Sequence, residues 1–321
     1  MIQLEEVSKR YGSQEALHNL TIRFPEGETS ILLGPSGCGK STTLRLINRL
    51  ITPDSGRISL RGKDIREYKP EILRRGMGYV IQSIGLLPHF TVEQNISIVP
   101  GLLKWESGKK HRRTMELLEM VGLEPDQYSS KMPGQLSGGE AQRIGVARAL
   151  AADPPILLMD EPFGAVDPLN REQLQKEFIA LQRRLKKTVV FVTHDIEEAV
   201  RIGDRIAIMK DGELQQFAPA PEIMMRPAND FVGEFIGQDR ALKLLSYYNA
   251  TCIMDESASE DRDFRDSIFV LPETSLKDCL SRMLDEGVSV IPVREGGTVY
   301  KGSVSLKSIE DIFLKKRSGR I

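Results

Sequence analysis

The sequence predicts an α/β fold for most of the chain, followed by a small α+β unit at the C-terminus. Up to about residue 236, short apolar or β-branched runs alternate with helical patterns, as in a mostly parallel sheet covered by helices. The runs at 30–33, 156–159 and 189–193 have the continuous apolar character of central strands buried on both faces. Each run ends next to polar residues that could perform chemistry.

Length and composition limit the classes of function. The 321 residues exceed a usual single domain, and 44 Lys plus Arg against 45 Asp plus Glu leave a net charge of -1, which argues against a nucleic-acid partner. The apolar runs are far shorter than the ~20 residues that cross a bilayer, and the charged N-terminus does not resemble a secretory signal, so we expect a cytoplasmic protein. Cys38, Cys252 and Cys279 form no CxxC pair, which predicts reduced thiols.

The end of the larger domain is predicted from a hairpin. Residues 205–210 and 213–216 have the pattern of two short strands, and Asp211-Gly212 between them suits a tight turn with positive φ. A helix is expected at 240–248, and the polar stretch 255–266 is too charged to bury much surface, as expected of a linker. The predicted division is a larger domain at 1–236, a helix and linker at 237–266, and a C-terminal unit at 267–321.

The C-terminal unit shows the pattern strand, helix, two strands and helix. Strands are expected at 268–271, 288–293 and 299–305, with a turn at Gly296-Gly297. The helix between the first two strands should begin after Thr274 or Ser275 and stop at Gly287. Its apolar stripe repeats at helical spacing and comprises Leu276, Cys279, Leu280, Met283 and Leu284.

A complete phosphate-binding loop, G-x-x-x-x-G-K-[ST], follows the strand at 30–33 and precedes a predicted helix at 42–50. Its glycines let backbone N–H groups turn toward phosphate oxygens, Lys40 can reach the β- and γ-phosphates of ATP, and the Ser41 hydroxyl can bind Mg²⁺. A glycine-rich turn that contains Lys-Ser by chance would predict neither the flanking strand nor a second acidic motif. The expected nucleotide-binding residues are Gly34, Pro35, Ser36, Gly37, Cys38, Gly39, Lys40, Ser41 and Thr42.

Two adjacent carboxylates, Asp160 and Glu161, end the buried strand at 156–159. Because adjacent strand residues point to opposite sides, Asp160 can hold Mg²⁺ while Glu161 faces a water placed for attack on the γ-phosphate. The alternative is that the two carboxylates only cap the following segment. Together with the phosphate-binding loop, the pair predicts ATP hydrolysis with Glu161 as the general base.

The segment Leu136-Ser137-Gly138-Gly139-Glu140 resembles the signature motif of the ATP-binding cassette (ABC) family. Ser137 and two glycines at the start of a helix expected at 140–151 expose N–H groups to an anionic phosphate. The resemblance implies a P-loop NTPase domain with a helical subdomain. It also implies a head-to-tail dimer in which Ser137, Gly138 and Gly139 complete the ATP site of a second copy.

Further residues match the motifs of this family. The resemblance assigns adenine stacking to Tyr11, a role as sensor of the γ-phosphate and Mg²⁺ to Gln82, a place in the dimer-facing loop to Asp167 and the switch histidine to His194. Taken singly, Tyr11 could be a half-exposed core aromatic and His194 a satisfied polar residue at a strand end. Glu140 stands where Gln is commoner, and residues 164–167 read Gly-Ala-Val-Asp in place of Ser-Ala-Leu-Asp; neither departure removes a phosphate contact.

A single cassette without a membrane span suggests an importer subunit that docks on separate permease proteins at the cytoplasmic face of the cell membrane, fed by a substrate-binding protein. Segments 47–50, 78–95 and 226–232 look like those of glycine betaine, carnitine and choline importers, an osmoprotectant subfamily. The alternatives are an importer of another small solute, such as an amino acid or polyamine, or a cassette ATPase outside transport.

Residues 267–314 resemble a single CBS motif, a ligand-sensing unit often present in pairs. Ser308 stands where the family commonly has an Asp that holds a ribose, so tight adenine-nucleotide binding is not expected there. The apolar stripe at 276–284, with Ile309, Ile312 and Phe313, is expected to leave one face uncovered that pairs with its twin in a second subunit. Packing back on the chain's own cassette is the alternative. The unit is expected to be a dimerisation tail or a tail that responds to ionic strength, with a weak contact to anionic lipid through Lys315, Lys316, Arg317 and Arg320.

Overall fold

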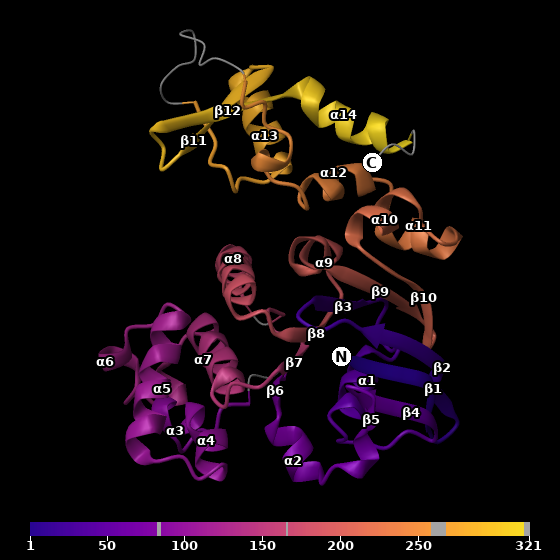
Figure 1. Ribbon diagram of the computed structural model, residues 1–321, viewed down its shortest axis with the longest axis vertical. Coiled ribbons are helices and arrows are strands. Elements are labelled where there is room, and N and C mark those ends of the chain that lie inside the picture. The colour runs from indigo at the N-terminus through magenta and orange to yellow at the C-terminus, as the bar shows by residue number, and fades with distance from the viewer. Residues whose placement is uncertain (82–84, 165, 258–267, 318–321) are drawn as a thin grey trace. The chain divides into compact units, whose positions relative to one another are not determined.

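The computed structural model describes residues 1–81, 85–164, 166–257 and 268–317, and of residues 168–170 and 314–317 only the backbone. The chain divides into two compact units, Met1–Pro219 and Ala220–Ile321 (Figure 1). This division lies earlier than the boundary at 236 expected from the sequence, because the helices α10 (Ala220–Met225) and α11 (Asp230–Ile236) group with α12 (Arg240–Leu245). The division into 1–236, 237–266 and 267–321 stays a prediction.

A sheet whose described strands run in the order β10-β9-β3-β8-β7-β6 forms the centre of the first unit. β3 pairs in parallel with β8 and β9, and β7 pairs in parallel with β6 and β8, whereas β10 is antiparallel to β9. Every residue of β3, β7 and β8 is buried, as expected of strands covered on both faces. The strands are β3 (Thr29–Leu33), β6 (Met77–Val80), β7 (Ile156–Asp160), β8 (Thr188–Thr193), β9 (Arg205–Lys210) and β10 (Glu213–Ala218).

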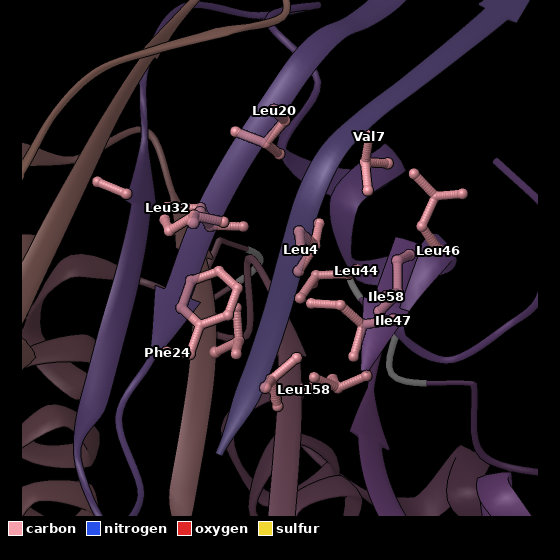
Figure 2. Close-up of a cluster of buried hydrophobic side chains, with 14 of the residues drawn as sticks. Leu4, Val7, Leu20, Phe24, Leu32, Leu44, Leu46, Ile47, Ile58 and Leu158 are labelled. Atoms are coloured by element: carbon pink, nitrogen blue, oxygen red, sulfur yellow. The ribbon is translucent and has the colours of Figure 1, made fainter. Parts of the chain in front are cut away.

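A second, antiparallel sheet packs over helix α1 (Lys40–Ile47), so that this helix lies between the two sheets. Figure 2 shows Leu4 and Phe24 of the second sheet, Leu44 and Ile47 of α1 and Leu158 of β7 in one apolar cluster. This packing fixes the helix that directly follows the phosphate-binding loop. The second sheet has the order β2-β1-β4-β5, from β1 (Ile2–Tyr11), β2 (Gln14–Phe24), β4 (Ser55–Leu60) and β5 (Lys63–Asp64).

A group of helices inserted between β6 and β7 forms the helical part of the first unit (Figure 1). Its longest members, α5 (Ser107–Met120) and α7 (Gly138–Leu150), pack against each other and against α3 (Val92–Ile96). The remaining helices of the unit are α2 (Pro70–Arg75), α4 (Ile98–Leu102), α6 (Pro125–Tyr128), α8 (Pro168–Leu185) and α9 (Ile196–Ile202). Among the described residues, no helix combines the length and the apolar character needed to span a bilayer.

The second unit has its own apolar core. After α12, the helix α13 (Leu276–Glu286) packs on an antiparallel pair, β11 (Val290–Glu295) and β12 (Val299–Ser305), and α14 (Leu306–Arg317) follows. The strand expected at 268–271 is reduced to one bridge between Val270 and Val293, and residues 258–267 lie outside the described part. The helix expected at 240–248 is the shorter α12.

The expectation that the α13 stripe leaves an uncovered apolar face is wrong. Leu276, Cys279 and Met283 are buried among Ile291, Val293 and Val304 of the unit's own hairpin, and Ile309 is buried with them. Leu280, Ile312 and Phe313 pack against this core, and only Leu284 of the stripe is strongly exposed, at 68%. The β11–β12 hairpin therefore covers the apolar face of α13 that the sequence predicted would pair with a second subunit. The basic side chains at 315–320 lie outside those that the structure describes.

The start of α13 offers a test of local stability. Ser275 is its N-cap, and the side chain accepts a hydrogen bond from the Asp278 N–H at 3.1 Å. Ser275→Ala should lower the free energy of opening α13, measured by native-state hydrogen exchange in the full chain, by about 1 kcal/mol. Ser281→Ala, at an exposed position inside the same helix, should instead raise it by a few tenths of a kcal/mol. Equal effects of the two substitutions would contradict the capping role.

Candidate nucleotide-binding and hydrolytic site

The phosphate-binding loop joins the carboxyl end of β3 to the first turn of α1. Gly39 is the N-cap of α1 with φ 102, and a Cβ added there would lie 2.6 Å from the Ala16 carbonyl oxygen. The first N–H groups of a helix have no intrahelical acceptor, and glycine brings no side chain to cap them. The N-terminus of α1 therefore keeps its N–H donors and its positive dipole end for an anion, which fits the phosphates of a nucleotide.

The Lys40 side chain folds over this loop. Its Nζ donates hydrogen bonds to the carbonyl oxygens of Gly34 and Pro35, at 2.7 and 2.8 Å, and the residue is only 7% exposed. Gly34 must be glycine, because a Cβ would come within 2.2 Å of the Met209 carbonyl oxygen. The loop thus carries a fixed ammonium group beside the N-terminus of α1. Pro35, Ser36 and Gly37 lie exposed on the loop, and Thr42 is half-buried in the helix.

Cys38 lies inside the loop with its side chain turned inward. It is 3% exposed, and its Sγ lies 3.7 Å from Lys40 Nζ. Burial raises the pKa of the Cys38 thiol, with Lys40 opposing that shift. The thiolate is the nucleophilic form, so reagents should reach and modify Cys38 slowly.

Modification of Cys38 should abolish ATP binding even though the thiol itself is dispensable. In a Cys252→Ser background, which removes the exposed cysteine, maleimide should label Cys38 slowly. Bound ATP should slow the labelling further, because it occupies the loop. Once attached, the reagent should block phosphate binding by its bulk. Cys279, whose pKa burial raises to about 12, should not compete. Mass spectrometry measures the labelling of Cys38, and an ATPase assay measures the loss of activity that follows when ATP no longer binds.

The matched control is Cys38→Ser, which should stay active and resist inhibition by the reagent. Full activity of a stoichiometrically labelled Cys38 would show that this side of the loop does not approach the nucleotide.

Asp160 and Ser41 form an oxygen pair at the end of β7. The Ser41 hydroxyl donates to Asp160 Oδ1 at 2.9 Å. Burial raises the pKa of the Asp160 carboxyl, and the hydrogen bond from Ser41 opposes the shift. A hydroxyl and a carboxylate are hard oxygen ligands, so this pair fits Mg²⁺, which usually takes one or two protein oxygens with phosphates and waters.

Glu161 follows Asp160 in a left-handed conformation, with φ 44. Its side chain is 23% exposed, and its Oε1 lies 3.4 Å from Nδ1 of His194, which follows β8 and is 66% exposed. The chain turns sharply at Glu161, with the Gly164 N–H bonded to its carbonyl oxygen at 3.1 Å. The Glu161 carboxylate thus approaches the His194 imidazole, while the Ser41 hydroxyl is bonded to Asp160.

Ser137, Gly138 and Gly139 form the N-terminus of α7, at the surface of the first unit. Ser137 and Glu140 make a reciprocal capping box: Ser137 Oγ accepts from the Glu140 N–H, and Glu140 Oε2 accepts from the Ser137 N–H at 2.7 Å. Glu140 Oε1 also accepts from the Tyr128 hydroxyl at 2.5 Å, and these bonds lower the pKa of the Glu140 carboxyl. Glu140 therefore completes the N-terminal cap of α7.

The remaining predicted residues are placed as follows. Tyr11 ends β1 with 46% of its surface exposed, and Lys9 Nζ lies 5.8 Å from its ring centre. Asp167 is exposed directly before α8, and its carbonyl oxygen accepts from the Arg171 N–H at 2.9 Å. Gln82 lies outside the described residues. Among the described residues, no hydrogen bond links Ser137 with the loop at 34–42 in this single copy.

Sequence reasoning missed a buried polar group behind this site. Glu198 of α9, Gln175 of α8 and Arg171 lie behind the turn of His194; Glu198 is 6% and Gln175 5% exposed. The sequence offered only a weak signal for this group. Glu198 follows His194 by four residues and lies on the buried face of its helix with Ala199 and Ile202.

Comparisons with known proteins agree with this geometry. A family model described as ABC transporter matches residues 17–164. The osmoprotectant import ATP-binding protein OsmV of Salmonella typhimurium is 47% identical over 298 residues, which are 91% of this chain and 76% of that protein. The glycine betaine/carnitine/choline transport ATP-binding protein OpuCA of Bacillus subtilis is 47% identical over 311 residues, 97% of this chain and 80% of that one.

Solved structures extend the match to the fold. A dimeric bacterial ABC transporter cassette superimposes with a TM-score of 0.62 at 37% identity, covering 68% of this chain and 98% of that chain. The same cassette in a dimeric post-hydrolysis state, bound to ADP and Pi, gives a TM-score of 0.61 at 36% identity, again over 68% of this chain and 98% of that one. The chain belongs to the ABC transporter family, as one of its ATP-binding subunits.

Proposed function

We propose that this subunit hydrolyses ATP with the residues gathered at the carboxyl edge of the central sheet. The uncapped N-terminus of α1 and Lys40 hold the β- and γ-phosphates, and Tyr11 stacks on the adenine. Ser41 and Asp160 hold Mg²⁺, with Gln82 as a further ligand. When bound, Mg²⁺ neutralises charge on the phosphate oxygens.

Within this arrangement Glu161 is the general base. Its carboxylate takes the proton of a water positioned in line with the γ-phosphate, and His194, 3.4 Å from Glu161, orients that carboxylate and contacts the γ-phosphate. The contacts of the two carboxylates support this division, because Glu161 approaches His194 whereas Asp160 accepts from the Ser41 hydroxyl.

We further infer that two copies of the chain work as a head-to-tail dimer. Ser137, Gly138 and Gly139 lie at the surface on the N-terminus of a long helix, where Gly138 and Gly139 can offer N–H donors and Ser137 its hydroxyl to a phosphate held by another copy; the Ser137 N–H is bonded to Glu140. Asp167, exposed at the start of α8, belongs to the facing loop. The dimeric state of the related cassette supports this proposal.

The transported solutes that best fit the relatives are the quaternary-amine osmoprotectants glycine betaine, carnitine and choline. The observation that carries this proposal is the similarity along nearly the whole chain to subunits named for these solutes, at 47% identity over 97% of the chain in one case. The subunit would act on the cytoplasmic face of the membrane, bound to permease subunits that receive solute from a binding protein.

Uptake measurements in the native host test this assignment. Deleting the gene should abolish uptake of at least one radiolabelled quaternary amine at high osmolarity. The wild-type gene should restore uptake, and Glu161→Gln should not. An amino acid and a polyamine serve as matched control solutes. Unchanged quaternary-amine uptake with a loss of amino-acid or polyamine uptake would favour the alternative importer.

A further inference from the structure

A buried carboxylate lies directly behind the turn that carries His194. Glu198 is 6% exposed on α9, and charged side chains are almost never buried to this degree unless they are paired. Burial raises the pKa of the Glu198 carboxyl, while hydrogen bonds from Thr193 and Gln175 and the charge of Arg171 oppose that shift. Several polar side chains therefore surround the Glu198 carboxyl, which lies outside the phosphate-binding loop.

One set of these contacts reaches both neighbours of His194. Thr193, just before the histidine, lines the same small cavity as Glu198, and its hydroxyl opposes the rise in the pKa of the Glu198 carboxyl. The same Thr193 oxygen accepts from the backbone N–H of Asp195, just after the histidine, at 3.0 Å. Asp195 in turn caps α9, since its Oδ1 accepts from the Glu198 N–H at 3.2 Å. The Glu198 side chain therefore lines the same cavity as His194 and both of its neighbours in the chain, and the Glu198 backbone is bonded to Asp195.

The other set of contacts reaches the segment that follows Asp167. Gln175 of α8 donates its Nε2 hydrogen bond to Glu198 Oε1 at 2.9 Å. One turn earlier in α8, Arg171 donates from Nη2 to the Val166 carbonyl oxygen at 2.9 Å, and its charge acts on Glu198. The same buried carboxylate thus connects the turn of His194 with the start of α8.

A small cavity joins this network to the hydrolytic residues. It has a volume of about 40 Å³, and Glu161, Arg171, Thr193, His194 and Glu198 are among the residues that line it. Glu161, His194, Glu198 and Arg171 thus border the same cavity. A displacement of Glu198 would therefore change the positions of Glu161 and His194, whose Oε1 and Nδ1 atoms are 3.4 Å apart.

We propose that Glu198 is a positioning residue for ATP hydrolysis, whose buried carboxylate holds the turn of His194 and the start of α8 in a single arrangement. The inference rests on the roles proposed above for Glu161 and His194. Glu198 touches neither nucleotide nor Mg²⁺ in this account; it acts through His194.

Kinetics of Glu198 variants in the full chain provide the first test. Glu198→Ala should lower kcat by ~10- to 100-fold, because small misplacements of catalytic groups have effects of this size, with the KM for ATP nearly unchanged. Glu198→Gln should retain part of the activity, since its amide oxygen can still accept from Gln175 Nε2. Glu197→Gln, on the next residue of the same helix, is the matched control and should be close to wild type. A rise in KM with unchanged kcat would overturn the proposal.

A double-mutant cycle separates positioning from a general contribution to folding. In a His194→Ala background, Glu198→Gln should change the single-turnover rate by less than about twofold, because its effect passes through the missing imidazole. A purely structural role predicts that the two effects multiply, which would contradict the inference. Full activity of His194→Ala alone would instead overturn the role proposed for His194, so the two failures are distinguishable.

Histidine NMR gives a readout that does not require turnover. The chain has 4 histidines, and the His194 imidazole signals can be assigned by their loss in His194→Ala. Glu198→Gln should shift the His194 signals, whereas Glu197→Gln should not. Identical His194 signals in both variants would show that Glu198 does not position the imidazole.

Discussion

Glu161→Gln should leave ATP binding intact and lower steady-state hydrolysis by ~10²- to 10⁴-fold, the usual cost of losing a general base. The substitution keeps the size and the hydrogen-bonding oxygen of the side chain but removes the group that accepts the proton from water. Because the loop at 34–42 is untouched, ATP should stay bound and hold two copies together. Phosphate release measures the first effect, and size-exclusion chromatography with ATP measures the second.

Glu177→Gln is the matched control for this experiment. Glu177 lies on α8 in an ion pair with Arg143 at 2.9 Å, away from the end of β7, so its loss should have little effect on turnover. Hydrolysis by Glu161→Gln within about threefold of wild type would be too small a loss for a general base. The proton would then have to leave by another route.

Lys40→Ala should weaken ATP binding itself. The ammonium group is fixed beside the N-terminus of α1 by the carbonyl oxygens of Gly34 and Pro35, where its charge can bind the phosphates of ATP. Charge-assisted hydrogen bonds contribute about 1.5 to 3 kcal/mol, so the dissociation constant for ATP should rise ~10- to 100-fold. Calorimetry or a fluorescent ATP analogue measures the change.

The exposed Lys69, at the N-cap of α2, supplies the control substitution Lys69→Ala, which should bind ATP normally. If Lys40→Ala bound ATP with wild-type affinity, Lys40 would not be one of the groups that hold the phosphates. A further contrast separates the two variants: Glu161→Gln should form dimers with ATP, whereas Lys40→Ala should fail to do so at the same ATP concentration.

The central sheet could be predicted from sequence because its strands are continuous apolar runs between polar residues. The runs at 30–33, 156–159 and 189–193 fall within β3, β7 and β8, and the hairpin at Asp211-Gly212 joins β9 to β10. Ser275 and Gly287 bound α13 as expected, because cap residues act through local geometry. These features depend on residues close together in the chain.

What sequence reasoning missed depends on contacts between distant residues. The grouping of α10 and α11 with α12 comes from packing that no local pattern encodes. The stripe of α13 was read as uncovered because nothing in its spacing reveals that Ile291 and Val304 close over it. Glu198 was overlooked because its partners Thr193 and Gln175 lie on a strand and on another helix, and only the fold brings the three together.

The contacts of Glu140 also bear on how the subunit would behave at high ionic strength. An ion pair between exposed side chains weakens as salt rises, because mobile ions screen the charges. The carboxylate of Glu140 is instead held by a backbone N–H of Ser137 and by the phenol of Tyr128, both of which are neutral donors at short range. The first turn of α7 should therefore stay formed as the ionic strength of the solution rises. The proposed role in osmoprotectant uptake would require the cassette to work at high ionic strength.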